Sequence, residues 1–158
     1  GYYLNLLSEI KKQKNNTTAY TAATTLIIGL EAILNKIYDY GIDNLYDETA
    51  KRSIATKEAL KSIGLDIYPD ISANSMTAIY SEDANAIRKI LKDEFSINIA
   101  GGQDHLKGKL FRINHMGFVK VYESSWVVNS IEMTLDRLGI RTFDGTANKV
   151  FNEKYFKG

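Results

Sequence analysis

The sequence predicts an α+β fold, in which a small, mostly antiparallel sheet carries helices on one face and is preceded by two or three helices. The prediction depends on a change in hydrophobic period along the chain. Up to Ile63 the apolar residues recur at helical spacing, whereas from Leu65 onward the order is strand, strand, helix, strand, strand, helix. The spacing supports neither parallel βαβ repeats nor a dinucleotide-binding fingerprint.

The leading helices are predicted from apolar stripes that end at a polar loop or at a glycine. A short helix over Tyr2–Lys14 has basic residues near its C-terminus, where the helix dipole favours cations. A helix over Ala22–Tyr40 ends at Gly41, and another over Asp43–Ile63 ends at Gly64. The inward positions are Leu26, Leu30, Ile33, Leu34 and Ile37 in the second helix and Leu45, Thr49, Ile54 and Leu60 in the third.

Four short segments have the composition and alternation of strands. They are Leu65–Tyr68, which Pro69 closes, Met76–Tyr80, Ser96–Ala100 and a strand within Gly108–Gly117.

Two further helices and a tail complete the predicted order. Apolar stripes predict helices over Ala84–Glu94 and Ser124–Leu138. The polar and aromatic residues 141–158 predict a C-terminal tail, with one helical turn around Lys149–Tyr155. Residues 1–140 would then form the domain.

The composition is that of an ordinary globular domain, with 44% hydrophobic and 25% charged residues. The net charge of +1 offers no electrostatic case for nucleic acid. The chain has no cysteine, which excludes disulfides and a cysteine nucleophile and fits a reducing, cytoplasmic compartment. The longest apolar run, Leu26–Leu30, is far shorter than the ~20 residues that cross a bilayer, so no membrane partner is expected.

The last predicted strand carries an arginine at its centre. Alternation puts Arg112 on the face opposite Phe111 and Ile113, which would anchor the strand in the core. A guanidinium held by a strand suits a carboxylate or phosphate, because its planar fork donates two parallel hydrogen bonds. The preceding Gly101-Gly102-Gln103 loop allows a tight backbone path near a ligand. The alternative is an exposed arginine on a half-solvated strand, reached through an ordinary turn.

A hydroxyl-rich loop, Thr17–Thr21, leads into the second helix and is a candidate anion site. Free backbone N–H groups and threonine hydroxyls at a helix start can bind a phosphate. Simple N-capping by a threonine is the alternative. Other chemistry finds less support, because the sequence has no Gly-x-Ser-x-Gly elbow, no Walker loop and too few histidines for a metal site.

Four stretches together resemble the C-terminal part of class V aminotransferases, which are pyridoxal-phosphate enzymes of fold type I. The nearest branch is that of the serine–pyruvate and alanine–glyoxylate aminotransferases. Phe111–Gly117 is similar to the family's Phe-Arg-Ile-Gly-His-Met-Gly block and is the most specific of the four. The others, Gly1–Leu6, Thr18–Ala22 and Ile99–Lys109, match in order and spacing. The resemblance covers residues 1–139 and implies the small domain of these enzymes.

This resemblance implies a role for each of four residues. Arg112 would bind the α-carboxylate of the substrate. Thr21 would reach across a homodimer interface to the phosphate of the other subunit's pyridoxal 5'-phosphate, with Tyr20 and Thr18 as neighbours. The reaction would transfer an amino group between an amino acid and a 2-oxo acid, of the alanine or serine with glyoxylate or pyruvate type.

The sequence also departs from the family. Ala19 and Ala22 stand where the family has prolines, which makes the loop less rigid, and Asn114 replaces a glycine, which could narrow the pocket. No segment matches the family's large domain, which holds the Schiff-base lysine and the aspartate beside the pyridinium nitrogen. The chain is therefore expected to act with a missing N-terminal large domain, which binds the cofactor covalently, and to be inactive alone.

Two alternative functions remain open. Another class V enzyme, such as a lyase or a cysteine desulfurase, would share the resemblance, although the absence of cysteine argues against the desulfurase. A non-enzymatic amino-acid-binding module would also suit helices on a small antiparallel sheet.

Overall fold

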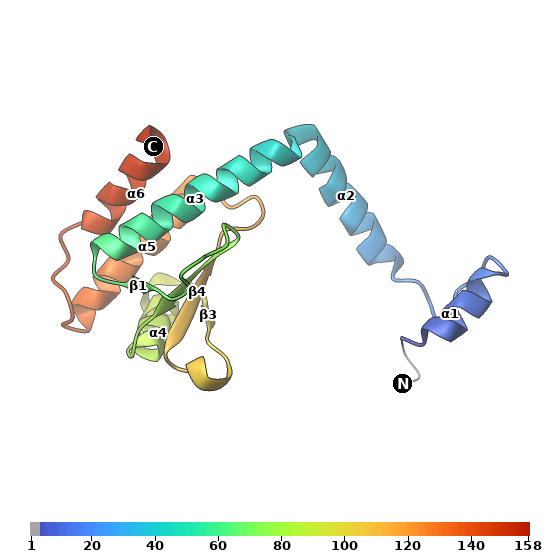
Figure 1. The fold of residues 1–158 in the computed structure, drawn as a ribbon, viewed down its shortest axis with the longest axis horizontal. Helices are drawn as coiled ribbons and strands as arrows, with labels where there is room; N and C mark the ends of the chain where they lie inside the picture. The colour runs from blue at the N-terminus through green and yellow to red at the C-terminus, as the bar shows by residue number, and fades with distance from the viewer. Residues whose placement is uncertain (1–3) are drawn as a thin grey trace. The chain divides into compact units, whose positions relative to one another are not determined.

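The computed structural model describes residues 4–158, which form six α-helices and a four-stranded sheet (Figure 1). The chain divides into two compact units, residues 1–41 and 42–158. The first unit contains α1 (Leu6–Gln13) and α2 (Thr24–Tyr40). The second contains α3 (Ile42–Ser62), β1 (Asp66–Ile67), β2 (Met76–Tyr80), α4 (Ala84–Phe95), β3 (Ala100–Gly101), the 3-10 helix η1 (Asp104–Leu106), β4 (Leu110–Asn114), α5 (Val121–Arg137) and α6 (Thr146–Lys157).

The first unit is organised around α1 and the loop that follows it. Asn5 caps α1 by accepting a hydrogen bond from the backbone N–H of Ser8 at 3.1 Å. Glu9 accepts hydrogen bonds from Gln13 Nε2 at 2.7 Å and from the Ala19 backbone N–H at 2.9 Å, which ties the loop to the helix. The predicted helix start at Tyr2 lies outside the described residues.

Helix α2 has the predicted end but a later start. Gly41 follows it with φ 90°, a conformation that favours glycine. The helix starts at Thr24 rather than Ala22, and no side chain caps it, so the alternative of a capping threonine is wrong. Its predicted stripe is exposed within the described chain, with Leu26 at 74% and Leu30 at 57% of their full accessibility.

The sheet of the second unit has the strand order β1-β2-β4-β3, and every neighbouring pair is antiparallel. The predicted bounds of β2 are confirmed, and β4 lies inside the predicted segment. Two of the predicted strands are shorter in the structure. The segment Ser96–Ala100 contributes only its last residue to β3, because Ser96 adopts left-handed backbone at the end of α4.

One face of the sheet forms the core. Phe111 and Ile113 of β4 and Ile79 of β2 are buried against residues from α3, α4, α5 and α6. Helices α3 and α4 contact the strands directly, and α5 packs on both of these helices. The predicted α+β fold with helices on one face is therefore confirmed.

The C-terminal residues differ from the prediction of a single helical turn. Helix α6 has 12 residues and lies beside α3, against which it packs closely (Figure 1). Its Ala147 and Phe151 are fully buried in the core.

The prediction that Ile54 faces inward is also wrong, because 52% of its surface is exposed. Among the described residues, no helix is long and apolar enough to cross a membrane.

Candidate functional site

Arg112 projects from the sheet face opposite the core. Its neighbours across the two ladders are Ala78 of β2 and Ala100 of β3, whose methyl groups leave room beside the longer side chain. The guanidinium Nε donates a hydrogen bond to the backbone oxygen of Gly101 at 3.1 Å. Neither terminal nitrogen has a hydrogen-bond partner within residues 4–158. The side chain is therefore anchored at Nε and half-exposed at its tip.

Arg112 lines an open depression of about 280 Å³. The wall opposite the strands is the segment from Gly102 to Leu106, which includes η1. The lining residues are Ala78, Gly102, Gln103, Asp104, His105, Leu106, Leu110 and Arg112. A small concave site with one charged fork and mixed polar and apolar walls suits a small carboxylate ligand.

The segment that walls this depression is packed too tightly to tolerate a side chain at Gly102. A Cβ atom there would lie 2.2 Å from the backbone oxygen of Leu106. The Gly102 N–H donates to the Leu110 oxygen at 2.7 Å, and the Leu106 N–H donates to the Gln103 oxygen at 2.9 Å. The predicted tight backbone path beside Arg112 is therefore present.

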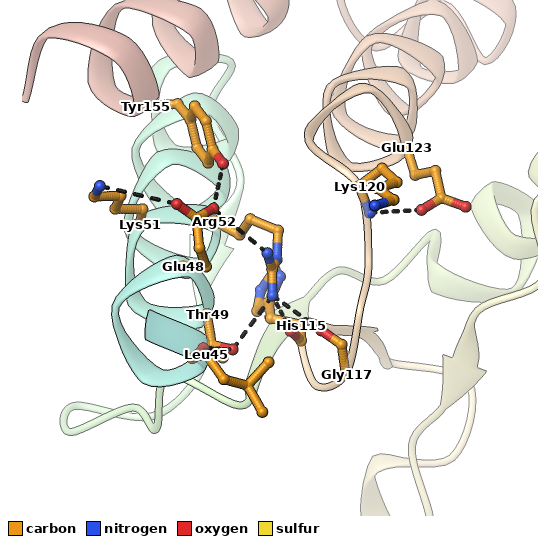
Figure 2. Close-up of polar contacts among 10 residues, drawn as sticks. All are labelled: Leu45, Glu48, Thr49, Lys51, Arg52, His115, Gly117, Lys120, Glu123 and Tyr155. Atoms are coloured by element: carbon orange, nitrogen blue, oxygen red, sulfur yellow. Dashed lines mark hydrogen bonds and ion pairs between the residues drawn. The ribbon is translucent and has the colours of Figure 1, made fainter. Parts of the chain in front are cut away.

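The far end of β4 is held by a buried arginine of α3 (Figure 2). Arg52 is only 4% exposed, and its Nη2 donates to the backbone oxygens of His115 and Gly117, each at 3.2 Å. Its Nη1 lies 3.8 Å from Glu48, which also accepts a hydrogen bond from Tyr155 of α6. These contacts connect α6, α3 and the turn after β4, so they fix the strand that carries Arg112.

His115 lies at the end of the same strand and faces the core. It is fully buried, and its Nε2 shares a hydrogen bond of 2.7 Å with the Thr77 hydroxyl. Burial, together with the positive charges of Lys57 and Arg52, lowers the pKa of His115 from 6.5 to about 4. The imidazole is therefore neutral near pH 7 and contributes to packing. Among the described residues, no group of three or more metal-ligating side chains comes together.

The threonine loop belongs to the first unit, whereas Arg112 belongs to the second. The Thr18 hydroxyl donates to the backbone oxygen of Tyr20 at 2.6 Å, which shapes the loop. Thr21 is exposed and precedes the first residue of α2 by three positions. Its hydroxyl has no partner within the described part of the chain, so it is available to a ligand.

Two parts of the site were not predicted from the sequence. Arg52 was missed because its carbonyl partners lie 63 and 65 positions further along the chain. Its place on the same helix stripe as Thr49 and Thr56 was the only available signal, since a charged residue on a core-facing stripe needs buried partners. Asp104 was not predicted as part of this site, because its position beside Arg112 depends on how the loop folds back.

Comparison with known proteins relates the chain to aminotransferases over nearly its whole length, although no family model matches it. An uncharacterized aminotransferase of Helicobacter pylori is 42% identical over 157 residues, which are 99% of this chain and 42% of that protein. A serine–glyoxylate aminotransferase of Methylorubrum extorquens is 26% identical over 144 residues, covering 85% of this chain and 36% of that protein. The chain thus spans less than half the length of these relatives.

A solved structure has the same fold. The ureidoglycine–glyoxylate aminotransferase of Bacillus subtilis superposes with a TM-score of 0.86 at 22% identity, covering 98% of this chain and 42% of that one. The α+β sheet and these relatives together show that the chain resembles part of an aminotransferase. The proteins that the chain resembles include serine–glyoxylate and alanine–glyoxylate aminotransferases. The resemblance seen in the sequence is confirmed.

Proposed function

We propose that the chain supplies the substrate-carboxylate site of a longer pyridoxal-phosphate-dependent aminotransferase. The reaction transfers an amino group between an amino acid and a 2-oxo acid, of the alanine or serine with glyoxylate or pyruvate type. The observation that supports this proposal is that Arg112 lines an open depression and is bound to Gly101 through Nε, while its terminal nitrogens have no hydrogen-bond partner within residues 4–158. The amino donor and the 2-oxo acceptor each carry an α-carboxylate. One fixed guanidinium can therefore bind the substrate in both halves of the reaction.

Arg112 contributes by orienting the substrate. The bond from Nε to Gly101 fixes the plane of the guanidinium, so the two outward nitrogens present parallel donors to a carboxylate. Holding the carboxylate in one orientation fixes the bond at Cα that must break, which lowers the entropic cost of reaching the transition state. The apolar side chains of Leu106 and Leu110 line the same depression and exclude water around the contact.

Pyridoxal 5'-phosphate would be held only in part by this chain. When bound, it acts as the electron sink for amino-group transfer. The exposed Thr21 hydroxyl fits a phosphate oxygen, and the Thr18 hydroxyl holds the loop through its bond to Tyr20. We assign the Thr21 contact to the cofactor of the neighbouring subunit in a homodimer. The covalent lysine would come from an N-terminal large domain, which accords with the chain spanning 42% of its Helicobacter pylori relative.

Substitution of Arg112 tests the proposal in the full-length gene product. Arg112→Lys keeps the charge but loses the bidentate geometry. Transition-state stabilisation should therefore fall by about 2–3 kcal/mol, which lowers kcat/KM roughly 30- to 150-fold. The loss should be similar for alanine and for glyoxylate, because both carry the carboxylate. Cofactor absorbance and the melting temperature should stay unchanged.

Arg137→Lys provides the matched control, because Arg137 is an exposed arginine of α5 whose side chain is 65% accessible. It should leave kcat/KM unchanged. If Arg112→Lys instead unfolds the domain and the surviving protein keeps wild-type kinetics, Arg112 is structural and the proposal is wrong.

A further inference from the structure

Asp104 places a second charge in the depression that holds the Arg112 fork. It is the first residue of η1 and lines the depression together with His105 and Leu106. Its carboxylate is exposed and forms no hydrogen bond or ion pair with residues 4–158. It is therefore free to interact with whatever Arg112 binds.

The backbone holds Asp104 in this position. Its φ of 47° lies in the left-handed region, which aspartate and asparagine adopt more readily than most residues with a side chain. Its backbone oxygen accepts from the Lys107 N–H at 3.1 Å, which closes the turn. The side chain therefore starts from a fixed point on the wall of the depression.

Among the described residues that line the depression, Asp104 is the only carboxylate and Arg112 the only arginine or lysine, and His105 lies beside them. The nearby Lys109 does not reach it, and its ammonium lies 3.5 Å from Glu82 instead. The other lining residues are Ala78, Gly102, Gln103, Leu106 and Leu110, none of which carries a positive charge that would neutralise a second carboxylate on a ligand. When the α-carboxylate of a ligand is bound to Arg112, the rest of the ligand lies beside the Asp104 carboxylate. A second carboxylate on that ligand would have the same negative charge as Asp104.

We propose that Asp104 is a specificity-determining residue, which rejects substrates that carry a second carboxylate. This inference rests on the proposed role of Arg112 as the carboxylate site. Amino acids and 2-oxo acids with short, uncharged side chains enter the depression without a like charge beside Asp104. Dicarboxylic substrates such as aspartate meet electrostatic repulsion, which is strongest where the site excludes water.

Asp104→Asn tests the inference in the full-length enzyme loaded with pyridoxal phosphate. Asparagine has nearly the same shape and accepts left-handed backbone, so the loop should keep its fold. The ratio of kcat/KM for aspartate to that for alanine should rise about fivefold. Calorimetric dissociation constants provide a readout without turnover, and succinate should gain affinity relative to propionate by a similar factor.

Asp93→Asn is the matched control, because it removes the same charge from an exposed site on α4 that pairs with Lys89. It should leave both ratios unchanged. Salt adds a second test, since raising ionic strength from about 0.05 to about 0.5 M should relax the discrimination of the wild type but not of Asp104→Asn.

The outcomes separate this inference from the proposed function. If Arg112→Lys weakens both substrates while Asp104→Asn changes neither ratio, Asp104 does not select the substrate and this inference alone fails. If Arg112→Lys weakens neither substrate, the carboxylate site is wrong and the inference falls with it.

Discussion

The side chain of Arg112 is fixed at its Nε and open at its tip, and both conditions follow from its neighbours. Alanine on each adjacent strand leaves space, and the Gly101 oxygen takes one donor. On the opposite face Phe111 and Ile113 are buried. A one-residue shift in strand register would expose them, so their burial fixes the face on which Arg112 lies. A strand with this alternation can hold a charged group at a surface without burying it, so the desolvation cost of a buried charge is avoided.

Arg52 contrasts with Arg112, because its guanidinium is buried and its partners are backbone oxygens of the same chain (Figure 2). Arg52→Met keeps the length and the packing of the side chain but leaves the carbonyls of His115 and Gly117 without their donor. We expect a loss of about 3 kcal/mol in the free energy of unfolding. Urea denaturation followed by the fluorescence of Trp126, the chain's only tryptophan, would measure it.

The control for this prediction is another cation beside the same carboxylate. Lys51 lies 3.9 Å from Glu48, but its side chain is 57% exposed. Lys51→Met should change the unfolding free energy by less than about 1 kcal/mol. Equal losses in the two variants would show that the carbonyl contacts of Arg52 add no stability.

At the scale of the element, the segment between β3 and β4 depends on one missing Cβ atom. Gly102→Ala would bring that atom within 2.2 Å of a backbone oxygen, which cannot move without opening the loop. The free energy of unfolding, measured through the fluorescence of Trp126, should fall by about 2 kcal/mol. Gly101→Ala is the neighbouring comparison, because its Cβ would meet only the flexible end of Arg88. A loss in Gly101→Ala as large as that in Gly102→Ala would contradict the packing argument.

The elements show which features of the fold are encoded locally. Strand β2 and the two faces of β4 were predicted, because alternation specifies them within a few residues. Helix α6 was predicted as a single turn, because its first turn is stabilised by a distant residue. The Ala147 N–H donates to Glu132 of α5, which lies 15 positions earlier in the chain, at 3.0 Å. Short-range propensity does not contain such contacts.

The same distinction applies to the site. Arg112 and the threonine loop were predicted from composition, spacing and resemblance. The depression around Arg112 could not be predicted, because it depends on a loop whose close packing against Leu106 is visible only in three dimensions. The contact of Arg52 with the turn after β4 depends on long-range packing in the same way.

At the scale of the whole molecule, the groups proposed for cofactor and substrate are divided between the two compact units. Thr21 lies in the first unit and Arg112 in the second. The apolar side chains of α2 are exposed within the described chain, which accords with a helix that packs against further protein. The chain covers 42% of its Helicobacter pylori relative, so more than half of that relative has no counterpart here.

We therefore expect the isolated chain to have no transaminase activity. Amino-group transfer needs a lysine that holds the cofactor and a group beside the pyridinium nitrogen, and the residues of this chain are assigned only to a carboxylate and a phosphate. The isolated chain would be incubated with pyridoxal phosphate, alanine and glyoxylate, and pyruvate would be measured over time. The full-length gene product, assayed in parallel, should form pyruvate. Turnover of about 1 per second or more by the isolated chain would contradict the proposal, because that rate needs a complete active site.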